Sequence, residues 1–162
     1  MANAFSDAAS SRVDDAFTTL VGTCYVSNEG SDTFPYTNAA MAARNLSSAV
    51  SVASERIVIA PGEYQFDHYV DEQTGYDTMG AVYRAVAIEA GEAAEDVVLD
   101  CSGKGGLILA NAGASLHGVT FRNYQTVQSA PVLYLKSGTA SDIVVSGGGV
   151  TLKGGECVYI GE

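Results

Sequence analysis

The fold is decided by three short apolar runs in the second half of the chain: LILAN at residues 107–111, VLYLK at 132–136 and CVYIG at 157–161. They begin 25 residues apart, and the further runs VTFRN (119–123) and IVVSG (143–147) lie between them. A repeat of this length, with several very short strands and no helix, is typical of one coil of a parallel β-helix. We therefore expect Leu107, Val132 and Cys157 to lie one above another on the same wall.

Short β-branched runs separated by glycine occur throughout the chain from Glu55 onward. The further runs are RIVIA (56–60), VAIEA (86–90), VVLDC (97–101) and VTLKG (150–154). No gap after Ala90 is long enough for a crossover helix, which excludes a doubly wound α/β sheet. An antiparallel sandwich agrees with the strand count alone, but the repeat spacing argues against it. We predict an all-β, single-stranded parallel β-helix of about four coils over residues 55–162.

Residues 1–54 are predicted to contain the first strand and two capping helices. Residues 5–20 place apolar side chains at spacings of three and four, the pattern of an amphipathic helix. We expect a short strand from Cys24 to Ser27 and a second helix over residues 38–53, capped by Asn38. The open end of a β-helix exposes backbone groups and apolar side chains, so both helices are assigned as its cover.

Both ends of the chain carry information about its context. The final run, CVYIGE, is still a strand pattern at Glu162, so we expect the solenoid to be truncated there. An uncapped last coil presents unpaired strand edges, which predicts end-to-end self-association. The opening MANAFSDAASSR lacks the basic start and apolar core of a signal peptide. A cytoplasmic protein and one whose signal was removed both agree with this opening.

Composition and charge exclude several classes of protein. Hydrophobic residues make up 47% and charged residues 17%, which indicates a globular chain rather than a disordered one. The net charge of −11 should repel phosphate backbones, so we expect no nucleic-acid partner. No apolar run approaches the roughly 20 residues that cross a bilayer, so no membrane span is expected. The chain contains no Cys-x-x-Cys pair, so we expect no zinc site. Cys101 and Cys157 lie in apolar runs and are predicted to be buried thiols.

Several ordered motifs resemble those of a known family. They are CYVSNEGSD (24–32), the helix pattern through Leu46 and Val50, the run IVIAPGEY (57–64) and the later stretch LHGVTFRN (116–123). This order is similar to the opening of secreted, right-handed parallel β-helix proteins of the pectin-lyase-like class. The resemblance implies a right-handed solenoid and a secreted or cell-surface location. It does not imply one activity, because the same scaffold carries lyases, hydrolases, adhesins and phage spikes. The chain departs from the family by having no tryptophan.

The insertion GEYQFDHYVDEQTGYDTMG (62–80) is the candidate binding segment, because long insertions on solenoids often bind ligands. The candidate ligand-binding residues are Tyr64, Asp67, His68, Tyr69, Asp71, Tyr76 and Asp77. Aromatic faces stack on sugar rings, and carboxylates hydrogen-bond hydroxyl groups or hold calcium. A solvated loop with its tyrosines packed on the wall, and paired carboxylates for glycoside hydrolysis, are the alternatives. The acids do not have the spacing of an EF-hand loop.

The other ionisable residues are assigned structural or solvent-exposed roles. His117 is expected to be an exposed turn residue, and the acids from Glu89 to Asp100 a solvated edge, with calcium binding the weaker alternative. Lys104, Arg122 and Lys136 resemble the basic residues of polysaccharide lyases without the accompanying calcium-holding acids. We assign no catalytic residue and no cofactor. The predicted function is a non-catalytic structural or carbohydrate-binding module with a polysaccharide partner. The stabilising start of a polysaccharide lyase or glycoside hydrolase, and a self-assembling or adhesin-type solenoid, stay open.

Overall fold

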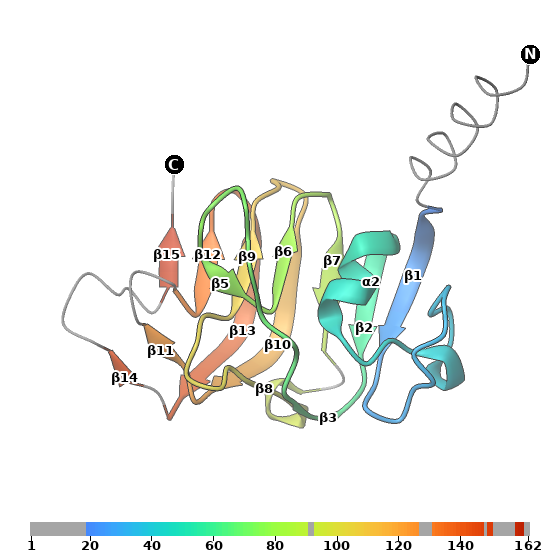
Figure 1. Cartoon of the computed structure of the whole chain (residues 1–162), viewed down its shortest axis with the longest axis horizontal. Helices are drawn as coiled ribbons and strands as arrows, with labels where there is room; N and C mark the ends of the chain where they lie inside the picture. The colour runs from blue at the N-terminus through green and yellow to red at the C-terminus, as the bar shows by residue number, and fades with distance from the viewer. Residues whose placement is uncertain (1–18, 91–92, 127–130, 148, 151–157, 161–162) are drawn as a thin grey trace, which may run out of the picture.

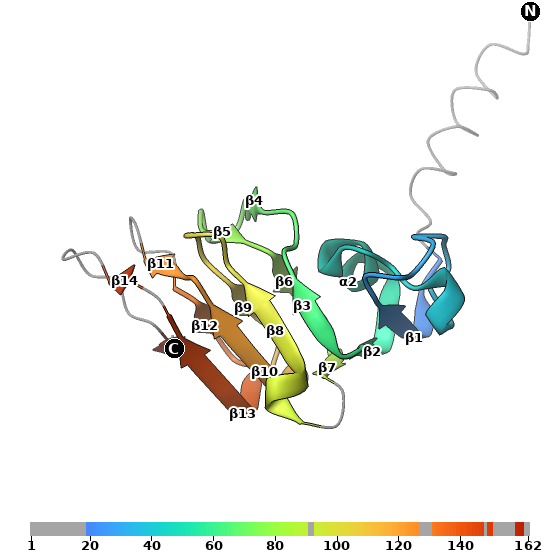
Figure 2. The ribbon, with the colours of Figure 1, turned by 90° about the horizontal axis from the view of Figure 1, so that it is seen from below.

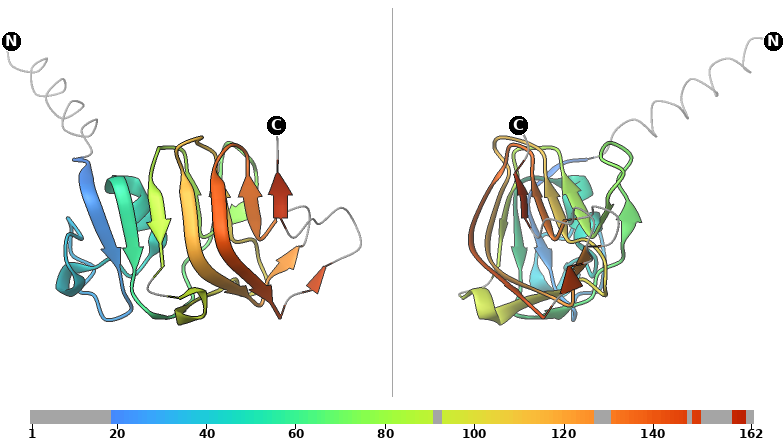
Figure 3. Two further views of the ribbon diagram at one scale, coloured as in Figure 1. Left: turned by 180° about the vertical axis from the view of Figure 1, so that it is seen from behind. Right: turned by 90° about the vertical axis from the view of Figure 1, so that its left-hand side faces the viewer.

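The computed structural model describes residues 19–90, 93–126, 131–147, 149–150 and 158–160. The protein is mostly β, and its parallel strands curl into a half-barrel (Figure 1). The right-hand view of Figure 3 looks along the row of strands and shows the sheets curving around a shared interior. The predicted helix at residues 5–20 lies outside the described residues, apart from its last two positions.

The larger sheet has seven strands, and each of its pairings is parallel. Its strands are β1 (Val21–Val26), β2 (Ala53–Ile59), β3 (Gly62–Tyr64), β7 (Ala87–Glu89), β8 (Val97–Asp100), β10 (Ser115–Arg122) and β13 (Thr139–Ser146). The long strand β10 pairs with β7 through its first half and with β8 through its second half. Gly118 lies between the two halves at φ +74°, a conformation that favours glycine. This glycine lets one strand follow two different neighbours.

A second parallel sheet forms the opposite wall. It has the order β15 (Val158–Ile160), β12 (Leu133–Leu135), β9 (Leu107–Leu109) and β6 (Gly80–Val82). Two small pairs complete the described strands: parallel β11 (Gln125–Thr126) with β14 (Gly149–Val150), and antiparallel β4 (Tyr69–Val70) with β5 (Asp77–Thr78). The 3-10 helix η2 (Ala94–Asp96) precedes β8.

The three apolar runs that suggested the repeat are neighbours, as predicted; the register of β12 with β15 has the predicted interval of 25 residues, but that of β9 with β12 differs by one residue. Leu107 lies opposite Leu133, not opposite Val132, and Leu133 lies opposite Val158. Cys157 lies outside the described residues. Every residue of β9 is buried, so the run LIL has no polar face to mark its register. The hydrophobic pattern therefore identified the wall but not the register of β9 with β12.

Stacked apolar side chains fill the interior. Cys24, Ile57, Ile88 and Leu116 occupy successive opposed positions on β1, β2, β7 and β10, and each is at most 1% exposed. Burying a side chain of this size contributes about 1.5–3 kcal/mol. Cys101 is also a buried free thiol, as expected, and burial raises its pKa to about 12. Among the described residues, no helix is both long and apolar enough to cross a bilayer.

The predicted helix over residues 38–53 is wrong as a single element. The chain instead forms the 3-10 helix η1 (Ala39–Met41), an extended segment and the α-helix α2 (Leu46–Val52). Asn38 does cap η1, since its side chain accepts a hydrogen bond from the Met41 amide. The break occurs because Ala43 pairs with β1: its amide donates to the Tyr25 carbonyl, and its carbonyl accepts from the Ser27 amide. These tertiary hydrogen bonds override the helical pattern of the alanines.

Candidate binding groove between α2 and β6

The helix α2 packs against β1, β2 and β6. Leu46, Ala49 and Val52 are buried on its inner face. Figure 1 shows α2 beside β6, at the end of the row formed by β15, β12, β9 and β6. The helix thus covers the edge of β6 that β9 leaves free.

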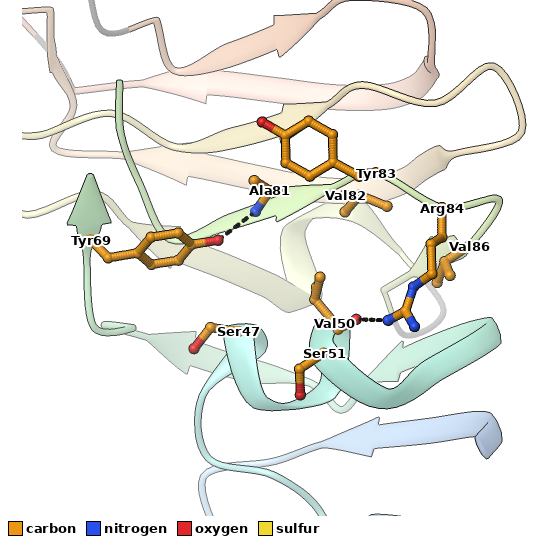
Figure 4. Close-up of a pocket in the computed structure, with 9 residues that line it drawn as sticks. All are labelled: Ser47, Val50, Ser51, Tyr69, Ala81, Val82, Tyr83, Arg84 and Val86. Atoms are coloured by element: carbon orange, nitrogen blue, oxygen red, sulfur yellow. Dashed lines mark hydrogen bonds between the residues drawn. The ribbon is translucent and has the colours of Figure 1, made fainter. Parts of the chain in front are cut away.

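An open groove of about 370 Å³ lies between α2 and β6 (Figure 4). The residues that line it are Ser47, Val50, Ser51, Tyr69, Ala81, Val82, Tyr83, Arg84 and Val86. Three valines give the groove an apolar surface, while the serines, tyrosines and arginine offer hydrogen-bonding groups. Such a mixture suits a compact ligand that has both apolar faces and hydroxyl groups.

Side chains satisfy the backbone groups on both sides of the groove. The Ala81 amide donates to the Tyr69 hydroxyl, with 3.0 Å between the nitrogen and oxygen atoms. Arg84 donates through Nη2 to the carbonyl oxygen of Val50 in the last turn of α2. A cation is favourable there, because the final carbonyls of a helix lack partners within it. The two contacts fasten the groove at opposite ends (Figure 4).

A buried carboxylate holds Tyr83 in place. Asp71 is only 6% exposed, and its Oδ2 accepts from the Tyr83 hydroxyl at 2.6 Å, the Thr74 hydroxyl at 2.7 Å and the Thr74 amide at 2.8 Å. Burial alone would raise the pKa of Asp71, but these hydrogen bonds outweigh it and lower the pKa below its ordinary value. Burial and the neighbouring carboxylate raise the pKa of Tyr83, so its hydroxyl remains protonated and donates.

The structure distributes the seven candidate residues of the insertion over several environments. Tyr69 lines the groove, and Asp71 lies behind it as the partner of Tyr83. Tyr64 is buried beside Phe66, with 5.1 Å between the ring centres, and its hydroxyl donates to the Ala60 carbonyl at 2.7 Å. Tyr64 thus belongs to the core.

The remaining four candidates contact other parts of the chain. Asp67 exchanges two hydrogen bonds with the Asn45 side chain, of 2.7 and 2.9 Å. The ring of His68 lies 3.0 Å from the Gly105 carbonyl oxygen. Tyr76 packs edge-on against Tyr134, and Asp77 lies 3.9 Å from Lys104. Figure 2 shows the β4–β5 hairpin, from which Tyr69, Tyr76 and Asp77 come, on the outside of the sheets. The insertion therefore does not gather all seven residues into one site.

Four polar residues of the groove were not predicted from the sequence: Ser47, Ser51, Tyr83 and Arg84. Ser47 and Ser51 are four positions apart, so a helix over this segment places them on one face. Tyr83 and Arg84 directly follow β6, outside the insertion that was considered. Their meeting depends on α2 packing against β6, a long-range contact with no local sequence signal.

Several other charged residues form pairs outside the groove. Arg122 donates to Glu63 and to Asp100, and Asn123 donates to Asp100 at 2.7 Å. Glu89 pairs with Arg56 at 3.4 Å. The side chain of His117 is 55% exposed, as expected, but the residue lies within strand β10 and not in a turn. No group of three or more histidine, cysteine or acidic residues is arranged to hold a metal ion within the described ranges.

No family model, no curated protein and no solved structure matches this chain.

Proposed function

We propose that this chain is a non-catalytic, carbohydrate-binding structural module of a secreted or cell-surface protein, built as the N-terminal part of a right-handed parallel β-helix. Two opposed parallel walls support the fold. In their later strands the interval between opposed residues is nearly constant, at 24 residues from β10 to β13, 26 from β9 to β12 and 25 from β12 to β15. The hydrogen-bonded turn after β1 supports it as well: Asp32 accepts from the Arg44 amide, and Gly30 packs closely on Ala42.

The groove between α2 and β6 is the observation that carries the binding function. Its apolar side chains and aromatic rings suit the non-polar face of a sugar, and its hydroxyl groups suit the ring hydroxyls. Tyr69 and Tyr83 are held by hydrogen bonds to Ala81 and Asp71, so a ligand meets rings that are already positioned. A preformed site lowers the entropy cost of binding.

A blocking substitution tests this function. Ser47→Trp places an indole in the groove, and it gives the chain its only tryptophan as a fluorescent reporter. Ser48→Trp is the matched control, because Ser48 is also half-buried on α2 but does not line the groove. We expect wild type and Ser48→Trp to bind members of a glycan panel, and Ser47→Trp to lose that binding while its thermal melt stays unchanged. A panel that binds neither wild type nor Ser48→Trp would refute the proposal.

Self-association is a second candidate function, favoured by the outer strand β13. In the described part of the chain, β13 pairs with β10 alone. Its inward residues Ile143 and Val145 are partly exposed, whereas their β10 counterparts Val119 and Phe121 are fully buried. A free strand edge beside apolar side chains recruits another strand. We expect light scattering to show concentration-dependent assembly that Val145→Lys suppresses; monomers at every concentration would contradict this function.

A further inference from the structure

We propose that the groove between α2 and β6 recognises a saccharide unit that carries a negative charge, and that Arg84 binds the charged group. This inference rests on the proposed carbohydrate-binding function and narrows it to one class of ligand.

Arg84 has no acidic partner among the described residues, a property it shares with Arg44 and Lys136, but it alone of these three lines the groove. It is the only charged side chain among the nine residues that line the groove. Arg56, Lys104 and Arg122 each lie within 4 Å of a carboxylate, but Arg84 has no such partner among the described residues. Its hydrogen bond to Val50 uses one N–H of a guanidinium that carries five. In a chain of net charge −11, an unpaired arginine in a groove indicates an acidic ligand.

The bond to Val50 also orients the guanidinium. Figure 4 shows Arg84 at one end of the groove, Tyr69 at the other and Tyr83 between them. The guanidinium plane matches the two oxygens of a carboxylate or sulfate group, which an ammonium ion would bind less specifically. A sugar ring bound at its charged end by Arg84 would extend towards Tyr69.

The nearest buried acid does not oppose this arrangement. Asp71 does not line the groove, and its Oδ2 already accepts hydrogen bonds from Thr74 and Tyr83. The hydroxyl of Tyr83 donates to this carboxylate, and Arg84 is the one charged side chain that lines the groove, so the lining presents a positive charge to the ligand.

The test compares charged and neutral sugars on the full chain. The probes are methyl glucuronide, glucose 6-sulfate and methyl glucoside, with binding followed by NMR titration of backbone amides. We expect wild type to bind at least one charged probe about tenfold or more tightly than the neutral one, with shifts at Ser47, Ser51 and Ala81. Arg84→Gln, which keeps a donor for the Val50 carbonyl, should lose that preference. Arg56→Gln removes one positive charge from an exposed ion pair outside the groove, and this variant should keep the preference for charged probes.

The outcomes separate this inference from the proposed function. Equal binding of charged and neutral probes, unchanged in Arg84→Gln, would overturn the role of Arg84 and leave sugar binding in place. The role of Arg84 would also be overturned if Arg56→Gln removed the preference for charged probes as fully as Arg84→Gln does. The overall charge of the chain would then explain the preference. Binding of no probe and no panel member would overturn both proposals. If Arg84→Gln lowers the melting temperature, Arg84→Lys is the alternative variant. It keeps the positive charge without the planar guanidinium, and it should bind the charged probes several-fold more weakly than wild type does.

Discussion

Tyr83→Phe removes one hydroxyl group and isolates the contribution of the Asp71 network to stability. The hydroxyl donates to Asp71 Oδ2 at 2.6 Å, the shortest of the three contacts to that atom. The carboxylate is 6% exposed, so water does not readily replace the lost donor. A hydrogen bond to a charged group contributes about 1.5–3 kcal/mol, and the half-buried position of Tyr83 favours the lower part of that range. We expect Tyr83→Phe to lower the free energy of unfolding by about 2 kcal/mol at pH 7.

The assay is urea unfolding followed by far-ultraviolet circular dichroism, since the chain has no tryptophan to report by fluorescence. Tyr25→Phe is the matched control, because the Tyr25 hydroxyl has no hydrogen-bond partner among the described residues. That variant should change the free energy of unfolding by less than about 0.5 kcal/mol. A double-mutant cycle with Asp71→Asn should give a coupling energy above about 1 kcal/mol. Equal effects of Tyr83→Phe and Tyr25→Phe would refute the reasoning.

Two further predictions concern acid stability and the turn after β1. The folded-state pKa values of Asp71 and Asp100 are lowered, so their stabilisation is present above the unfolded value near 3.9 and is lost as the pH falls through the folded values. Urea midpoints should therefore fall below about pH 4, and Asp71→Asn should flatten that fall; an unchanged slope would exclude Asp71 as a contributor. In Gly30→Ala the new Cβ would meet the Ala42 carbonyl oxygen at 2.1 Å, so we expect a loss of about 1–3 kcal/mol in the free energy of unfolding. Gly22→Ala meets only the flexible end of a side chain and is the control; equal stability of the two variants would contradict the close packing of this turn.

The parallel arrangement was predictable because its signals are local and repeated. Runs such as LILAN and VLYLK combine β-branched or large apolar residues with flanking glycines, and their spacing is too short for helices between them. These features correctly predicted that the runs at residues 107–111, 132–136 and 157–161 are neighbours. They could not set the register of β9 against β12, because all three residues of β9 are buried and the pattern has no polar alternation.

The helix and the groove depend on long-range contacts. The alanines from Ala39 to Ala53 have a helical period, but hydrogen bonds from Ala43 to β1 break the helix into two pieces. The groove needs α2 to pack against β6, whose residues follow some 30 positions later. Tyr69 alone of the candidate residues lines it, because the hairpin brings that tyrosine to Ala81.

The central claim is that successive turns of the chain lie parallel and in the described register, and a disulfide tests it most directly. His117 and Ser141 are opposed, outward-facing positions of β10 and β13, and their side chains are 2.9 Å apart. Directly opposed residues have Cα atoms about 4.8 Å apart, within the range a disulfide spans. In a Cys157→Ser background, mild oxidation of His117→Cys/Ser141→Cys should yield a cross-linked monomer. His117→Cys/Thr139→Cys, displaced by two residues to about 8 Å, should not. Cross-linking of the displaced pair with failure of the opposed pair would contradict the account.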